Sequence, residues 1–419
     1  MVPIAIAGRP GIWPNRAVWA VFALYIVVAG YNLGYPSQML WDEKYYIPQA
    51  QQLANGLGLR ETSHPPLGKF LTALAIVICG DTPTAWRVPA LIGGVGILWC
   101  VYVLGVALLR SPAAALIATT LLACESLAFV QSRTAIYSSI MLFFELLAMV
   151  LVVKCRDRGS AVLLGLSAIA FGAAVSTRWV AFSALPVIAL FAWSSFEGRS
   201  IGVRRIFAMC ALFVLLSVSV YLVLFSVGPL SRGQGIFDAL KLNVRMFSLH
   251  WANLSVEHRY SSPWWSWPLM MRPVWWGFES YPMTAADGSQ VVEGMISIGN
   301  PVFFAAIPIA VVWGAYRALW CRSVYHTIVL IAVFTQWLQW SWVPQNTFLH
   351  YFYTVLPFAA LLIGDVLVAV WRSSVVGKVL CATYITAAVG MFAYWYPLLT
   401  AMQVSRAFVD QHMWIESWW

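Results

Sequence analysis

The chain has 419 residues, of which 61% are hydrophobic and only 10% are charged. This composition excludes an ordinary soluble protein and is typical of a chain that crosses a membrane many times. The formal net charge of +9 could indicate a nucleic-acid partner, but most basic residues stand in short clusters between apolar segments. Such clusters are typical of the charges that orient a membrane protein, so we expect no nucleic-acid binding.

The apolar segments predict an all-α polytopic membrane protein. A helix of about 17–25 apolar residues is long enough to cross a bilayer. The first such segment follows Arg9 and Arg16 and has no small-residue cleavage pattern after it, which indicates a retained anchor. We expect eleven spans, at residues 17–35, 89–109, 112–131, 135–153, 160–176, 179–196, 206–228, 299–317, 324–343, 348–371 and 378–398.

Residues 67–80 are apolar but number only 14, so their length does not decide whether they cross the membrane. If they do not cross and the N-terminus is cytoplasmic, the basic clusters at 154–158, 199–205, 317–322 and 372–378 all face the cytoplasm. That arrangement obeys the positive-inside rule, whereas a crossing here would turn every later cluster outward. We therefore expect a juxtamembrane helix that lies along the membrane.

A polar stretch follows the first span, in the external loop expected at residues 36–88. It contains Asp42, Glu43, His64 and Lys69. Adjacent carboxylates beside a membrane suit general-base chemistry, because the low dielectric of lipid raises their pKa. The two side chains point in different directions on any regular element, so they need not share one role. The alternative for Asp42 is structural, as the N-cap of an interfacial helix.

Two arginines on the same outer side, Arg133 and Arg178, stand where the chain re-enters the membrane. Charged residues at membrane depth are costly, and a guanidinium binds phosphate oxygens through two hydrogen bonds. Both therefore suit a lipid-linked phosphate, although snorkelling at the end of a span explains them equally well. Lys69 either neutralises the same phosphate or flanks the juxtamembrane helix. A carboxylate base and cationic phosphate binders on one face predict transfer of a group from a lipid phosphate.

Residues 229–298 form the second large polar segment of what we interpret as one integral membrane domain, residues 1–419. The segment separates an N-terminal catalytic module, residues 1–228, from a C-terminal membrane region, residues 299–419. Its aromatic run, His258-Arg-Tyr-Ser-Ser-Pro-Trp-Trp-Ser-Trp-Pro268, predicts a fixed and irregular surface. The alternative is that these rings only anchor the loop, since Trp and Tyr gather at membrane interfaces.

Metal and nucleotide chemistry find little support in the sequence. The six histidines are scattered without ligand-type spacing, so a divalent metal is not indicated and we expect no required cofactor. A glycine-rich phosphate loop is missing from the sequence, which argues against a nucleotide-driven enzyme or pump. A transporter would be expected to have inverted repeats and midplane charges, and the sequence shows no internal repeat.

The polar motifs resemble those of a known family. Asp42-Glu43 followed by His64-Pro-Pro-Leu-Gly-Lys69 resembles the signature of the protein O-mannosyltransferases, which are GT-C membrane glycosyltransferases. Later stretches agree in the same order: Glu125-Ser-Leu-Ala-Phe-Val-Gln-Ser-Arg133, Ser176-Thr-Arg-Trp179, and the aromatic run with Gly299-Asn-Pro301 after it. The resemblance implies a GT-C fold with about eleven transmembrane helices. It also implies a compact bacterial enzyme, because residues 229–297 are too short for the luminal insert of the eukaryotic members.

The resemblance implies inverting transfer of mannose from polyprenyl-phosphate-mannose to Ser or Thr hydroxyls, at the outer face of the bacterial cytoplasmic membrane. Asp42 would deprotonate the hydroxyl and Glu43 would hold the acceptor. Arg133, helped by Lys69 or Arg178, would stabilise the leaving phosphate. Further substrate contacts are implied for His64, Glu125, His258, Trp264 and Trp265. The implied partners are the undecaprenyl- or decaprenyl-linked donor, membrane lipids, a secreted polypeptide acceptor and the secretion translocon.

Four positions depart from the family pattern. Ser138 stands where the family usually has Asp, Arg178 replaces its usual Lys, and Glu125 replaces an acidic residue that is commonly Asp. Gln345 occupies the position of the Arg that usually precedes the late aromatic stretch. These departures leave the base intact and bear on donor and acceptor specificity. The alternative is a GT-C enzyme that uses another polyprenyl-phosphate sugar, or a lipid or glycan acceptor.

Overall fold

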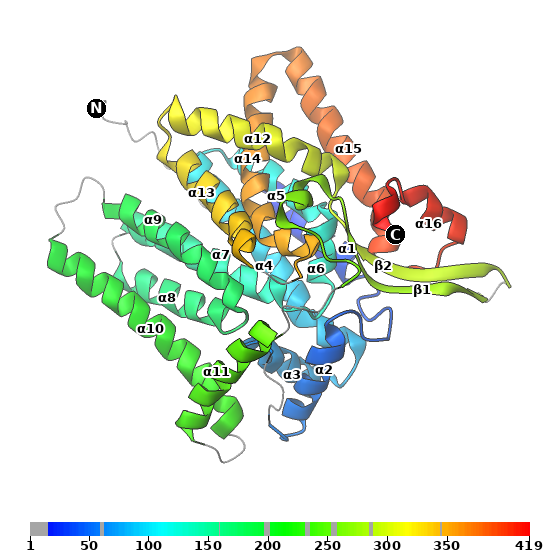
Figure 1. Ribbon diagram of the computed structural model, residues 1–419. Helices are drawn as coiled ribbons and strands as arrows, with labels where there is room; N and C mark the ends of the chain where they lie inside the picture. The colour runs from blue at the N-terminus through cyan, green and yellow to red at the C-terminus, as the bar shows by residue number, and fades with distance from the viewer. Residues whose placement is uncertain are drawn as a thin grey trace.

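The computed structural model describes residues 16–58, 63–158, 160–196, 202–230, 235–252, 258–284, 288–343 and 346–419. Helices dominate these residues, as the sequence predicts, and Figure 1 shows them packed side by side in one bundle. Each of the eleven expected spans coincides with a helix or with two helices in succession. These helices are α1 (Arg16–Gly30), α4 (Pro83–Leu109), α5 and α6 (Pro112–Ala123, Ser126–Ser132), α7 (Ser138–Arg158), α8 (Ala161–Val175), η1 and α9 (Trp179–Ala184, Leu185–Phe196), α10 (Val203–Leu230), α12 (Pro301–Leu319), α13 (Val324–Leu338), η5 and α14 (Leu349–Val355, Leu356–Ser373) and α15 (Val375–Leu399).

The number of spans stays a prediction. Among the described residues, six helices are long and apolar enough to cross a membrane, or seven if the pair α5 and α6, bent by 69°, is one span. Several of the other expected spans, such as α1 and α8, are apolar helices of 15 residues each. A helix of 15 residues rises about 22 Å, which is less than the roughly 30 Å hydrocarbon core of a bilayer.

A helix occupies the ambiguous segment 67–80, as expected. It is α3 (Leu67–Cys79), and it packs between α2 (Glu43–Ala54) and the start of α4. In Figure 1, α2 and α3 lie beside each other at the lower edge of the bundle. One face of α3 is buried, while Leu74, Val77 and Ile78 are exposed on the other. An exposed apolar face suits a helix against lipid, and its placement along the membrane surface remains a prediction.

The centre of the bundle is α4, which packs against α5 and α7. Small residues let these helices approach closely. A Cβ atom at Gly93 would lie 2.9 Å from the backbone of Ser139 in α7, and one at Gly105 would lie 2.8 Å from Ala115 in α5. The start of α4 is fixed by Thr82, whose side chain accepts a hydrogen bond from the Ala85 amide. This packing holds the first residues of α7 beside the end of α4 that adjoins the external loop.

The external segment contains regular structure that the sequence analysis did not predict. Strands β1 (Val274–Thr284) and β2 (Gln290–Ser297) form an antiparallel hairpin in which Val274 pairs with Ser297. Alternating and β-branched residues such as those of β2 favour a strand. In β1 the register is irregular near Trp275, which interrupts the alternation of side chains that would predict a strand. The hairpin follows the aromatic run 258–268, for which the irregular surface was expected, and it was itself not predicted. The remaining elements are α11 (Ile236–Ala252), η3 (Trp264–Leu269), η4 (Gln339–Trp342), α16 (Arg406–His412) and η6 (Glu416–Trp418).

Candidate active site

Segments that are far apart in the sequence meet at one end of the bundle. The amide of Leu67 donates to the carbonyl of Ser176 at 2.9 Å, which ties the start of α3 to the end of α8. The Ser262 amide donates to the Thr347 carbonyl at 2.8 Å, which ties the aromatic run to the start of η5. These hydrogen bonds gather the expected outer loops around the first residues of α2. Asp42, Lys69 and Arg178, which were singled out from the sequence, lie in and around this region.

Asp42 lies directly before α2 and has a carboxylate that the helix does not use. It is the N-cap residue, yet its side chain accepts no capping hydrogen bond. Instead, the Tyr46 hydroxyl donates to its Oδ2 at 3.3 Å. The residue before it, Trp41, has a left-handed φ of +42°, a conformation that costs about 1–3 kcal/mol in a non-glycine residue. The fold therefore holds Asp42 in a constrained turn with its carboxylate available to a substrate.

Burial raises the pKa of the Asp42 carboxyl, and the nearby Arg178 guanidinium and the Tyr46 hydrogen bond lower it in part. A carboxylate with a raised pKa is a stronger base than an exposed one. Only the Tyr46 hydroxyl donates to it among the described contacts, so it retains capacity to accept a proton from a substrate hydroxyl. These properties are those of a general base.

Arg178 lies at the end of α8 and reaches toward the first residues of α7. Its Nη1 donates to the hydroxyl of Ser138 at 3.1 Å and to the Ile136 carbonyl at 3.4 Å. The side chain is buried, and it forms no ion pair with a carboxylate among the described residues. Because Ser138 is neutral, its hydrogen bond does not compensate the positive charge of Arg178. Arg178 is thus a buried cation close to Asp42, suited to an anionic ligand.

A small pocket of about 20 Å³ opens beside Arg178. Arg178, Ser138 and Met141 line it together with residues of η5. The lining residues are Ser138, Met141, Arg178, Val180, Trp340, His350, Tyr351, Tyr353 and Thr354. Tyr351 and Arg178 both interact electrostatically with Asp42, so the pocket adjoins the candidate base.

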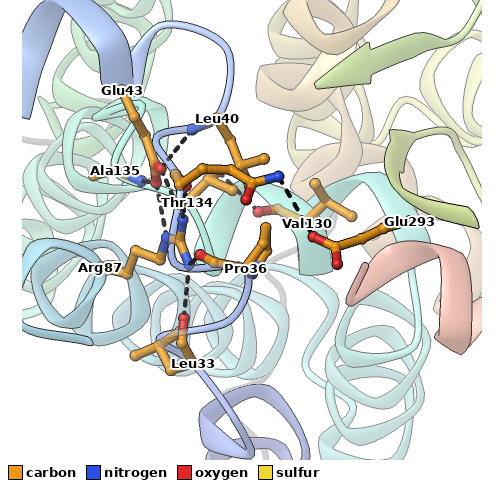
Figure 2. A network of polar contacts seen from close by, with 10 residues as sticks. Leu33, Pro36, Leu40, Glu43, Arg87, Val130, Thr134, Ala135 and Glu293 are labelled. Atoms are coloured by element: carbon orange, nitrogen blue, oxygen red, sulfur yellow. Dashed lines mark hydrogen bonds and ion pairs between the residues drawn. The ribbon is translucent and has the colours of Figure 1, made fainter. Parts of the chain in front are cut away.

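Glu43 has a different environment from its neighbour Asp42. Figure 2 shows its carboxylate pointing into the protein toward Arg87 of α4. Arg87 Nη2 lies 2.9 Å from Glu43 Oε2, and both side chains are fully buried. The amides of Leu40 and Ala135 also donate to Glu43, at 3.0 and 2.8 Å. Both carboxylate oxygens are therefore occupied inside the protein, and the different directions expected for Asp42 and Glu43 are confirmed.

Arg87 also holds the loop that leads to Asp42. Its two Nη atoms donate to the carbonyls of Leu33, Pro36 and Gln38 at 2.9–3.2 Å. One buried guanidinium thus fixes both the loop between α1 and α2 and the first residue of α2 (Figure 2). The sequence analysis missed Arg87, although an arginine inside an apolar helix is itself a signal of a buried partner.

Two further predicted site residues hold the fold together. Arg133 donates to the carbonyls of Ala29, Tyr31 and Asn32 at the end of α1. Glu125 caps α6 by accepting a hydrogen bond from the Ala128 amide at 2.6 Å, and it also accepts one from the Asn300 amide at 2.9 Å. These contacts do not bring either residue to Asp42.

His64 lies beside Tyr46, whose hydroxyl donates to Asp42, and Lys69 is hydrogen-bonded to His64. The Lys69 ammonium donates to the His64 carbonyl at 3.2 Å, and the imidazole of His64 lies 5.7 Å from the Tyr46 ring. The ring of Tyr46 also stacks on the ring of Tyr137, with centroids 4.7 Å apart. Lys69 is fully buried in the first turn of α3.

The aromatic run divides into two groups. His258 packs against Trp41 at 5.0 Å, next to Asp42, and burial with the nearby Arg259 lowers its pKa. Trp264 instead packs against Trp337 of α13 at 5.8 Å. Trp265 is 55% exposed, so it is free to contact lipid or substrate. The described contacts bring His258 into the site but not the two tryptophans.

The structure adds residues from η5 that the sequence analysis did not assign. His350 packs its ring against Trp41, Trp276 and Tyr351, and it lines the pocket. The late aromatic stretch around His350 was the available signal, but nothing in it indicated proximity to Asp42. Gln345 lies outside the described residues. Among the described residues, no group of three or more His, Cys, Asp or Glu side chains is arranged to hold a metal ion.

Comparison with known proteins identifies the family. Residues 63–224 match the family model for dolichyl-phosphate-mannose-protein mannosyltransferase, and residues 236–418 match that for the C-terminal four-transmembrane region of protein O-mannosyltransferase. The chain belongs to the protein O-mannosyltransferase family. Similar curated members of this family are the polyprenol-phosphate-mannose–protein mannosyltransferases of Mycobacterium tuberculosis and Mycolicibacterium smegmatis. They are 25% and 24% identical to this chain, with 100% and 96% of this chain and 94% and 93% of theirs covered.

Solved structures show the same fold. The chain superposes on the Saccharomyces cerevisiae Pmt1-Pmt2 complex bound to the sugar donor with a TM-score of 0.81, at 13% identity over 96% of this chain and 92% of that one. It also superposes on ArnT from Cupriavidus metallidurans bound to undecaprenyl phosphate with a TM-score of 0.62, at 16% identity over 90% of this chain and 64% of that one. The predicted GT-C fold of this mannosyltransferase family member is confirmed.

Proposed function

We propose that this chain transfers mannose from polyprenyl-phosphate-mannose to Ser or Thr hydroxyls of a polypeptide, with inversion at the anomeric carbon. Family membership supports the reaction, and the names of the mycobacterial relatives support the donor and the acceptor. The observation that carries the proposal is the pairing of Asp42, a half-buried carboxylate, with Arg178, a buried cation beside a pocket.

In the proposed reaction the acceptor oxygen attacks the anomeric carbon of mannose while its proton passes to the carboxylate of Asp42. The bond between that carbon and the phosphate oxygen breaks, and the lipid phosphate leaves with the bonding electron pair. Arg178 stabilises the charge that develops on the phosphate, and the Ser138 hydroxyl orients the guanidinium. Since the phosphate leaves as an anion, the step needs no acid to protonate it.

The remaining predicted residues take roles that follow from their contacts. We propose that Glu43 positions Asp42 through Arg87, because both of its oxygens are bonded inside the protein. Its expected role in holding the acceptor stays a prediction. Lys69 is proposed to add positive charge near the donor site. Arg133 is proposed to support the site indirectly, because it holds the end of α1. His258 and His64 border the site on two sides and are proposed to contact the acceptor.

We propose that the active site faces the outside of a bacterial cytoplasmic membrane. The positive-inside distribution of the basic clusters supports this orientation, since the site and the clusters fall on opposite sides of the expected topology. A polypeptide acceptor on that face emerges from the secretion translocon, which is therefore the proposed source of substrate.

The test is a transfer assay with membranes that contain this chain. Radiolabelled polyprenyl-phosphate-mannose and a Ser/Thr peptide are the substrates, and the Asp42→Asn variant is the matched control. The expected result is mannosyl-peptide formation that falls by about 10²–10⁴-fold in the variant. Transfer that survives Asp42→Asn would refute the assignment of the base. Transfer to a lipid but to no peptide would replace the proposed acceptor.

A further inference from the structure

Arg178 stands in the short link between α8 and η1, where its backbone is extended, with φ −153° and ψ 139°. On one side of this link, the Ser176 carbonyl accepts from the Leu67 amide, which ties it to α3. On the other side stands Trp179, the first residue of η1. Because Arg178 and Trp179 share a planar peptide unit, the direction of the Arg178 side chain depends on how Trp179 is held.

A chain of hydrogen bonds holds Trp179 from the outer segment. Its ring N–H donates to the hydroxyl of Tyr221 in α10 at 3.1 Å. The Tyr221 hydroxyl donates in turn to the side-chain oxygen of Asn243 in α11. Phe225 and Met246 are buried beside this chain, and the rings of Trp179 and Tyr221 pack against them. Helix α11 is therefore connected to the residue next to Arg178.

Away from its contacts with α10, α11 carries an apolar stripe and a polar stripe side by side. Each stripe repeats at the spacing of one helix face, with members three or four residues apart. The apolar stripe consists of Phe237, Leu240, Val244 and Phe247, which are 47–73% exposed. The polar stripe consists of Asp238, Lys241, Arg245 and Ser248. A helix with this division of its surface is typical of the interface between lipid and water.

The neighbours of α11 indicate that lipid covers the apolar stripe. Helix α11 packs against α10, which has the smallest buried share of the six described helices that are long enough to cross a membrane. The apolar stripe thus continues a surface that already faces lipid. In Figure 1, α11 lies at the lower edge of the bundle, the edge that also carries α2. Lys241 and Arg245 beside the stripe suit the phosphates of lipid headgroups.

We propose that α11 lies in the outer interface of the bilayer and, through Asn243, Tyr221 and Trp179, holds Arg178 in place. These three are positioning residues, since they act on the reaction only through Arg178. The inference rests on the proposed function, which gives Arg178 its role in stabilising the leaving phosphate. A shift of α11 away from lipid would displace Trp179 and lower the transfer rate without any change to Arg178 itself.

The first test is Tyr221→Phe, which removes the hydroxyl from both hydrogen bonds and keeps the ring. We expect kcat for mannose transfer to fall by about 10- to 100-fold, the effect of a small misplacement of a catalytic group. Tyr384→Phe is the matched control, because it loses a hydrogen bond to the Val302 carbonyl in another part of the bundle, and it should retain wild-type activity. In an Arg178→Gln background, Tyr221→Phe should cause little further loss, since no guanidinium remains to be positioned.

The second test concerns the lipid contact. Val244→Asp and Ser248→Asp add the same charge to the two stripes, and only Val244→Asp should lower the transfer rate, to about the level of Tyr221→Phe. Val244→Cys and Ser248→Cys are then compared in nanodiscs of phosphatidylcholine and phosphatidylglycerol, in a protein whose native exposed cysteines are replaced by serine. A water-soluble maleimide should label Val244→Cys about tenfold more slowly, because its side chain lies below the headgroups.

The outcomes separate the inference from the proposed function. Full activity of Tyr221→Phe, or losses that multiply in the Arg178→Gln background, would overturn the positioning role. Equal labelling of the two cysteine variants would overturn the lipid contact. Failure of the wild-type protein to transfer mannose would overturn the proposed function and the role of Arg178 with it, whereas the labelling result does not depend on activity.

Discussion

Glu43 and Arg87 form a fully buried ion pair, with Arg87 Nη2 2.9 Å from Glu43 Oε2. The pair connects the first residue of α2 to α4, and the same guanidinium binds three carbonyls of the preceding loop. Asp42 lies between that loop and α2, so the pair fixes the candidate base from both sides. A buried charge is stable only when its partner is present, which makes this relationship directly testable.

Removal of one partner is expected to destabilise the protein strongly. Arg87→Gln leaves the Glu43 carboxylate buried without its cation, at a cost of about 3–5 kcal/mol in the free energy of unfolding. Thermal unfolding of the purified protein in detergent measures the effect. The control is Arg406→Gln, which breaks an exposed pair with Asp410 and should change stability by less than about 1 kcal/mol. Equal stability of the two variants would show that the buried pair does not hold the fold.

The pH dependence of transfer should report Asp42. Its pKa is raised in the folded protein, so activity is expected to fall as the pH is lowered through that pKa and the carboxylate becomes protonated. The Tyr46 hydrogen bond lowers the pKa in part, so Tyr46→Phe should move the acidic limb of the profile to higher pH. The measurement is kcat/KM against pH for both proteins. A limb that stays in place, or moves to lower pH, would contradict the assignment.

Asp42→Asn should also affect stability in a pH-dependent way. The raised pKa means that the folded protein holds the proton of Asp42 more tightly than the unfolded chain does. Asp42 therefore costs no stability below its unfolded pKa of about 3.9, and it destabilises the folded protein above that pH. The variant should therefore be more stable than the wild type near neutral pH, and this advantage should shrink in acid. Thermal unfolding at several pH values tests both parts. A variant less stable than the wild type at neutral pH would indicate a structural role for Asp42.

Gly68 at the start of α3 should not tolerate a side chain. A Cβ atom there would lie 2.5 Å from the ring of Tyr137, which stacks on Tyr46 beside Asp42. Gly68→Ala is expected to cost about 1–3 kcal/mol by overpacking and to lower the transfer rate by displacing these rings. Gly390→Ala in α15, where a Cβ meets open space, should instead gain about 0.5–1 kcal/mol. Unfolding and activity assays on both variants give the comparison.

Two native cysteines can test the orientation in the membrane. Cys79 at the end of α3 and Cys321 after α12 are both exposed, and the proposed topology places them on opposite sides. A membrane-impermeant thiol reagent applied to intact cells should label Cys79, and label Cys321 only after permeabilisation. Cys79→Ser and Cys321→Ser assign the labels. Labelling of Cys321 in intact cells would overturn the proposed orientation.

The sequence by itself determined the membrane class, the helices within the expected spans and the motif around Asp42. Apolar length and charge placement are properties of the local chain, so they remain readable without a fold. The helix α3 is an example, because its short apolar segment can be recognised in the sequence alone. The β1–β2 hairpin is the opposite case, because its register is irregular and depends on pairing between strands.

Only the tertiary structure decided which charged residues face the pocket. Asp42 and Glu43 are neighbours in sequence, yet one lies near Arg178 and the other is bonded to Arg87, 44 positions away. Arg133 and Arg178 likewise look equivalent at two span ends, but Arg133 is committed to carbonyls about a hundred residues earlier. A buried charge takes the partners that helix packing brings to it, and those partners come from distant parts of the chain. For the same reason the place of η5 beside Arg178 became visible only in the tertiary structure.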